Sequence, residues 1–225
     1  IGEKISIRRF EKVTADVVAS YIHGGGRIGV LVAGNGVSDD AAKEALTNIA
    51  MQIAAMNPQY ISRDEISADE LAKMKEITID SALNDPFSLP KPVLSKLIEK
   101  AVAGVWSAED VAIYEEKKSN MNFLPNFLSK EAKAQLAEIA CADKEEISGN
   151  KIFSGLVEGR ISKQMKEICL LDQGYVKAED GKQTVAAYLK SVNPALKIAK
   201  FVRFEVGEGM EKKNEDFPAE VAKQM

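Results

Sequence analysis

Apolar and polar residues alternate along parts of the chain with a period of two, the pattern of a half-buried β-strand. We expect strands over residues 4–10 and 198–206, which alternate in this way, and over the two β-rich runs at residues 16–22 and 27–33. Between these two runs stands His23-Gly24-Gly25-Gly26, a turn signal that predicts a β-hairpin. The apolar run at residues 28–32 is then expected to form a central, well-buried strand.

Elsewhere the apolar residues recur at the three- and four-residue spacing of amphipathic helices. Ser38, followed by Asp39 and Asp40, predicts the start of a helix that ends near residue 56 and covers the sheet. Further helices are predicted over residues 67–83, 92–103, 107–118, 129–140, 150–168 and 184–192. Their expected N-terminal signals include Ser67, Ser107, Ser129 and Ser148.

The helical block separates the first three predicted strands from the last one, which indicates an insertion within a sheet domain. The fold class is therefore α+β, with an antiparallel sheet of three to four strands packed against helices and a long, coiled-coil-like helical insertion. We expect a discontinuous core subdomain over residues 1–66 and 169–210, a helical arm over 67–168 and a tail helix within 211–225.

The composition is that of an ordinary soluble globular protein, with 225 residues and a net charge of −4. This balance argues against direct nucleic-acid binding, and no apolar run is long enough to span a membrane. Cys141 and Cys169, with one His in the chain, do not make a zinc site, so we expect no metal or cofactor and a reducing, cytoplasmic compartment. Because the chain begins with Ile1, a piece of a longer or processed protein is expected.

The glycine-rich stretch allows two chemical interpretations besides a hairpin turn. His23-Gly24-Gly25-Gly26 resembles the oxyanion loop of some α/β-hydrolases, but the chain has no G-x-S-x-G elbow and no second His. Residues 24–29 fit G-x-G-x-x-G, yet a strand follows where a dinucleotide site needs a helix. We therefore expect no enzyme and no nucleotide site. A small-molecule hydrolase using this loop and a structural oligomerisation domain stay open as alternatives.

Two charged groups have simpler explanations than a catalytic site. Glu205, Glu208 and Glu211 are expected to form a solvated acidic surface, because no other acid–base group is fixed beside them. Arg8 and Arg9 are expected to make salt bridges at a strand edge.

Five segments, in this order along the chain, resemble elongation factor Ts. They are residues 1–9, residues 20–32 (Ser-Tyr-Ile-His-Gly-Gly-Gly-Arg-Ile-Gly-Val-Leu-Val), residues 49–55, residues 156–160 and residues 201–209 (Phe-Val-Arg-Phe-Glu-Val-Gly-Glu-Gly). The second and the last are the most specific. The resemblance implies a non-enzymatic factor that binds elongation factor Tu and promotes exchange of its GDP for GTP, and it leaves a second copy of the chain open as a further partner.

The resemblance also implies contact residues. Matched position by position, together with the approachable glycines of the turn, the expected partner-binding residues are Ile1, Gly2, His23, Gly24, Gly25, Val176 and Lys177. The tail helix near residues 217–223 matches a further contact module of the family.

The chain departs from the family pattern in three places. Gly174, Tyr175 and Lys177 differ from the family's commoner Pro-Phe-Val pattern. The Thr-Asp-Phe-Val motif, which acts near the Mg²⁺ of the partner, does not occur in these 225 residues. Residues 84–150 exceed the usual hairpin and are expected to form an extra helical unit.

Overall fold

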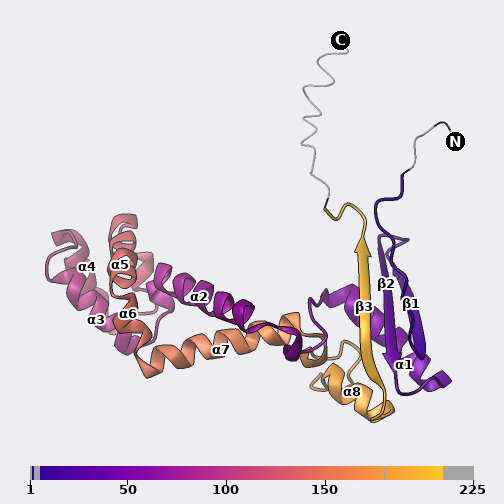
Figure 1. Ribbon diagram of the computed structural model, residues 1–225. Helices are drawn as coiled ribbons and strands as arrows, with labels where there is room; N and C mark the ends of the chain where they lie inside the picture. Colours follow the sequence, from indigo (N-terminus) through magenta and orange to yellow (C-terminus); the bar gives the residue numbers. More distant parts are fainter. Residues whose placement is uncertain (1, 3–5, 180, 210–225) are drawn as a thin grey trace. The chain divides into compact units, whose positions relative to one another are not determined.

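A computed structural model describes residues 2, 6–179 and 181–209 (Figure 1). The chain divides into two units, one built from residues 1–61 and 170–225 and the other from residues 62–169. The predicted tail helix lies outside the described residues.

Three antiparallel strands make up the sheet of the first unit. They are β1 (Val17–His23), β2 (Ile28–Asn35) and β3 (Lys197–Glu205), in the spatial order β1-β2-β3. β2 is central, and its register pairs Ile28 with His23 on one side and with Glu205 on the other. The predicted hairpin and the α+β fold class are confirmed, and the sheet has three strands.

The strand predicted over residues 4–10 is wrong for its described part. Residues 6–10 form no strand, and the side chains of Ile7 and Phe10 are 85% and 84% exposed. Alternation makes a segment suitable for a sheet, but a strand also needs hydrogen bonds to a neighbouring strand. Here the segment is attached by side chains instead, since the Arg9 guanidinium binds the Glu208 carboxylate at 3.0 Å.

One long helix covers a face of this sheet (Figure 1). Helix α1 (Asp40–Met56) buries Leu46, Ile49 and Ile53 completely. Burial of one such side chain stabilises the fold by about 1.5–3 kcal/mol. The N-cap is Asp39 and not the predicted Ser38, because the Asp39 carboxylate accepts the Ala42 N–H at 2.7 Å.

A shorter helix completes the core of the first unit. A 3-10 helix (Leu170–Asp172) leads to an irregular loop and then to α8 (Val185–Val192). α8 adds Val185 and Leu189 to the apolar cluster beneath the sheet. The loop between them is therefore held against the same core as α1.

The second unit is helical. Its helices are α2 (Ala68–Asn84), α3 (Lys91–Val102), α4 (Ala108–Lys117), α5 (Lys130–Ala142), α6 (Lys144–Ser148) and α7 (Lys151–Ile168). All but α6 were predicted, and the caps Ser67, Ser107 and Ser129 are confirmed. Ser148 was wrong as a cap: it ends α6, and the Asn150 side chain caps α7. No helix in the described part of the chain is long and apolar enough to cross a membrane.

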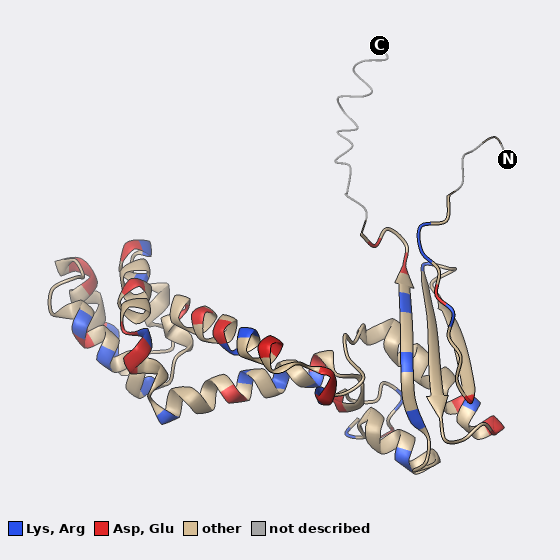
Figure 2. Ribbon diagram, in the orientation of Figure 1, with Lys and Arg blue, Asp and Glu red and all other residues tan. Residues whose placement is uncertain are grey.

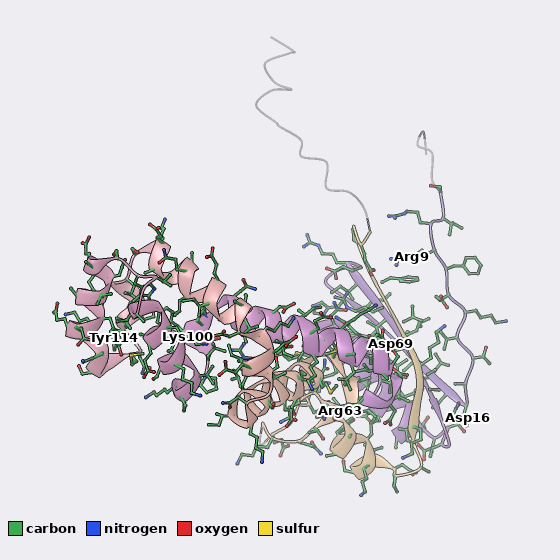
Figure 3. All side chains as sticks on the ribbon, turned by 60° about the vertical axis from the view of Figure 1, so that its left-hand side comes forward. Arg9, Asp16, Arg63, Asp69, Lys100 and Tyr114 are labelled. Atoms are coloured by element: carbon green, nitrogen blue, oxygen red, sulfur yellow. The ribbon has the colours of Figure 1, made fainter. Side chains whose placement is uncertain are left out.

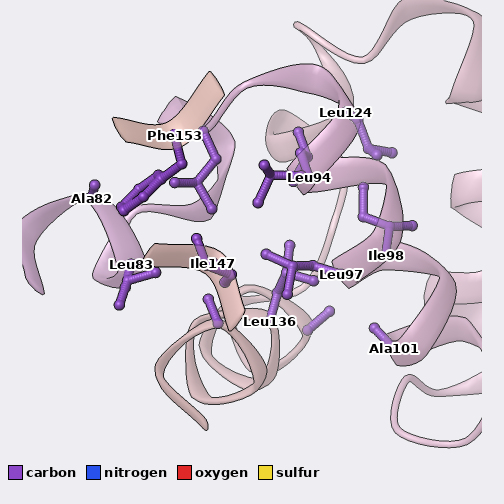
Figure 4. Close-up of a cluster of buried hydrophobic side chains, with 14 of the residues drawn as sticks. Ala82, Leu83, Leu94, Leu97, Ile98, Ala101, Leu124, Leu136, Ile147 and Phe153 are labelled. Atoms are coloured by element: carbon purple, nitrogen blue, oxygen red, sulfur yellow. The ribbon is translucent and has the colours of Figure 1, made fainter. Parts of the chain in front are cut away.

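This unit has a hydrophobic core of its own (Figure 4). Phe153, Leu136, Leu97 and Ile98 are at most 2% exposed and come from three helices, α7, α5 and α3. Trp106 belongs to the same cluster and donates its indole N–H to the Ala132 carbonyl at 2.9 Å. Residues 84–150, which exceed the family's usual helical hairpin, thus form a packed helical unit and not an extended loop.

Candidate protein-binding site

The hairpin tip between β1 and β2 is an exposed, glycine-shaped turn. Gly24, Gly25 and Gly26 have φ values of +61°, +66° and +95°, a left-handed conformation that side chains disfavour. No atom lies within 4 Å of a Cβ built on Gly25 or Gly26. The glycines serve the turn conformation, and they leave its backbone accessible from outside.

His23 ends β1 at this tip, and a neighbouring tyrosine orients its ring. The Tyr21 hydroxyl lies 3.0 Å from His23 Nδ1, and the ring centroids are 5.8 Å apart. Residues two apart on a strand share a face, which brings the two rings together. When Tyr21 donates to Nδ1, the proton of the neutral imidazole is on Nε2, directed away from the tyrosine.

This geometry does not favour the hydrolase alternative. The hydroxyl that the structure places against His23 is the phenol of Tyr21, whereas a hydrolase of that type uses a serine next to its base. The glycine turn also leads into β2, so it offers no helix N-terminus to a phosphate.

The N-terminal segment carries basic residues and the end of β3 an acidic one (Figure 2), and the side chain of Arg9 is labelled in Figure 3. The guanidinium of Arg9 lies 4.5 Å from the centroid of the Phe204 ring and 3.0 Å from the Glu208 carboxylate. The Arg9 hydrogen bond, followed by the Glu205 N–H, lowers the pKa of Glu208. The Val206 N–H donates to the Arg27 carbonyl at 2.9 Å, so this surface adjoins the hairpin tip.

The second expected contact segment is the loop that precedes α8. The Val176 side chain is 48% exposed, and Lys177 is also exposed. Tyr175, which lies between this loop and the core, stacks on Tyr188 of α8, with the ring centroids 4.1 Å apart and an interplanar angle of 13°. Burial, together with the hydrogen bond to Tyr188, raises the pKa of Tyr175, so this ring stays a neutral phenol.

The predicted contact residues therefore fall into two groups on the first unit. One is the hairpin tip, with His23, Gly24 and Gly25, and the other is the loop with Val176 and Lys177. Gly2 is exposed, and Ile1 lies outside the described residues.

Sequence reasoning missed the residues that support these groups. Tyr21 orients His23, and two amides of α1, Asn48 and Gln52, bind the loop at residues 174–177. The sequence did offer one signal for Gln52, because it lies within a helix stripe that is otherwise apolar. Among the residues that the structure describes, no cluster of three His, Cys, Asp or Glu side chains could hold a metal ion.

A sequence model described as "Elongation factor TS" matches residues 1–208. The chain belongs to the elongation factor Ts family. It is 38% identical to an elongation factor Ts of Clostridioides difficile (strain 630) over 229 aligned positions, which cover the whole chain and 55% of that protein. It is 36% identical to that of Clostridium botulinum (strain Eklund 17B / Type B), with 56% of the relative covered.

Elongation factor Ts of Halothermothrix orenii is 35% identical and is covered over 54% of its length. The chain thus spans about half the length of the curated relatives that it matches. The resemblance found in the sequence is confirmed. The alignments to elongation factor Ts also run through residues 84–150, which the sequence comparison had set apart as a departure from the family.

Proposed function

We propose that this protein binds elongation factor Tu and promotes the exchange of its GDP for GTP, with this chain supplying mainly docking surfaces. Membership in the elongation factor Ts family is the observation that carries the proposal. The chain acts as a binding protein and not as an enzyme. A translation factor works beside ribosomes, so we infer a cytoplasmic location.

The hairpin tip is the first proposed docking surface. Its backbone is accessible at Gly25 and Gly26, and His23 presents an imidazole whose Nδ1 is already bonded to Tyr21. With Nδ1 accepting, Nε2 carries an N–H that donates outward. The partner group at this point would then be a hydrogen-bond acceptor, such as a carbonyl or a carboxylate.

The loop before α8 is the second proposed docking surface. Val176 offers an exposed apolar side chain, and the next residue, Lys177, is exposed and carries an ammonium that binds Asn48 Oδ1 at 2.7 Å. Protein interfaces have an apolar core and a polar rim, so Val176 would lie in the core of this contact and Lys177 at its rim. The matching partner surface would combine an apolar pocket with an acceptor or an acidic side chain.

The nucleotide itself is expected to stay on the partner. The family's Thr-Asp-Phe-Val motif, which acts near the bound Mg²⁺, is absent from these 225 residues. We therefore expect this chain to form a complex but to accelerate GDP release much less than a factor that carries the motif.

A pull-down and a fluorescence assay test the two parts of the proposal. The chain should retain elongation factor Tu, and it should speed release of fluorescent GDP only slightly. Val176→Asp should weaken the complex, whereas Ile77→Asp, at an apolar side chain that is 68% exposed on α2, should not. Absence of a complex would refute the proposed partner, and acceleration equal to that of a full-length factor would refute a docking role alone.

A further inference from the structure

Helix α1 carries two amide side chains, one turn apart, on the side that meets the loop before α8. Asn48 and Gln52 are four residues apart and therefore neighbours on the helix surface. Gln52 is 0% exposed and lies between the core residues Ile49 and Ile53. Burial of a carboxamide in an apolar core is unfavourable unless its hydrogen bonds are satisfied, so its partners need an explanation.

Gln52 binds three groups of the loop. Its Nε2 donates to the Gln173 side-chain oxygen and to the Gly174 carbonyl, both at 3.0 Å. Its Oε1 accepts the Val176 N–H at 2.8 Å. Because a backbone N–H can only donate, the Val176 bond also fixes which end of the amide is the oxygen.

Asn48 holds the next residue of the loop. Its Oδ1 accepts the Lys177 ammonium at 2.7 Å, and its Nδ2 donates to the Tyr188 hydroxyl at 2.9 Å. Tyr188 in turn stacks on Tyr175. The Val176 main chain and the Lys177 side chain are thus each bound by one amide of α1.

We infer that Gln52 and Asn48 are positioning residues for partner binding, which fix the loop at residues 173–177 before the partner arrives. The inference rests on the proposed function, in which Val176 and Lys177 touch elongation factor Tu. A loop that is already ordered loses little conformational entropy on binding. Without the two amides, the Val176 and Lys177 side chains are still present, but the loop that carries them is less ordered. The chain should therefore bind the partner more weakly.

The first experiment replaces the amide without removing its bulk. Gln52→Met keeps an unbranched side chain of similar length and loses all three hydrogen bonds. Amide hydrogen exchange at residues 174–176 should become faster, whereas exchange within β2 should stay as in the wild type. Affinity for elongation factor Tu should fall at least tenfold, about 1.4 kcal/mol. Gln164→Met, at an exposed position of α7, is the matched control and should change neither quantity.

A double-mutant cycle separates positioning from a general structural role. In the background of Val176→Asp and Lys177→Ala the proposed contact is already lost, so Gln52→Met should cause no further loss of affinity. An equal loss in both backgrounds would overturn the inference. So would a loosened loop with wild-type affinity. Asn48→Ala, at a half-buried position, should weaken binding severalfold and decides the matter if Gln52→Met does not fold.

Failure of the proposed function would look different. If the wild-type chain does not bind elongation factor Tu, the partner and the inference both fall. If it binds but Val176→Asp with Lys177→Ala binds equally well, the loop is no contact and the positioning role is refuted, while the proposed partner stands.

Discussion

A buried carboxylate in the helical unit ties the starts of two helices together. Asp110, in the first turn of α4, is 6% exposed. One of its oxygens accepts the Ser129 N–H at 2.9 Å, and the other accepts the hydroxyls of Ser107 at 2.7 Å and Ser129 at 2.9 Å. These serines are the N-caps of α4 and α5, so we predict that Asp110→Ala destabilises this unit.

The magnitude follows from the three groups that lose their acceptor. A hydrogen bond to a charged group contributes about 1.5–3 kcal/mol, but the two serine hydroxyls can rotate to other acceptors. Since such terms are not additive, we expect Asp110→Ala to lower the free energy of unfolding by about 2–4 kcal/mol. Asp110→Asn keeps one oxygen for the Ser129 N–H and should cost roughly half as much.

The same site predicts a pH dependence. Burial alone raises the pKa of Asp110, but the Ser129 N–H and the hydroxyls of Ser107 and Ser129 outweigh it, and the pKa lies below its usual value. A depressed folded-state pKa gives stability that is present above the unfolded pKa of about 3.9 and is lost as pH falls through the folded pKa. The wild-type unit should therefore lose stability below about pH 4, and Asp110→Asn should lose less.

Trp106 provides the assay. It is the single tryptophan of the chain, and its indole N–H binds the Ala132 carbonyl of α5, so its fluorescence reports this region in urea. Glu109→Ala is the matched control, because it removes an exposed acid from the same helical turn. If Asp110→Ala and Glu109→Ala shift the urea midpoint equally, the reasoning from buried hydrogen bonds is refuted.

Two further substitutions test the first unit. Gly36 has a φ of +95°, and a Cβ there would overlap the Ala195 carbonyl. Gly36→Ala should therefore lower the free energy of unfolding by about 2–4 kcal/mol, measured by hydrogen exchange of the β2 amides. The control Gly25→Ala, in open space at φ +66°, should lower it by only about 1 kcal/mol. Tyr21→Phe removes the hydroxyl that orients His23, so titration should show about two- to fivefold weaker binding of elongation factor Tu, and unchanged affinity would contradict the role of this bond.

The sequence predicted best those features that depend on near neighbours. The helix starts at Ser67, Ser107 and Ser129 were predicted because a cap binds an N–H only two or three residues away. The hairpin followed from three glycines that suit a left-handed turn. The strand predicted over residues 4–10 is wrong for its described residues 6–10, since alternation carries no information about a pairing partner.

The candidate site shows the same division. Sequence pattern and resemblance alone singled out His23, Val176 and Lys177. Only the tertiary structure decided what orients them, because the bond from Val176 to Gln52 joins residues 124 positions apart and that from Lys177 to Asn48 joins residues 129 apart. Local spacing determines secondary structure through interactions within a turn or two, whereas contacts of this range exist only after the sheet, α1 and α8 have packed around a common core.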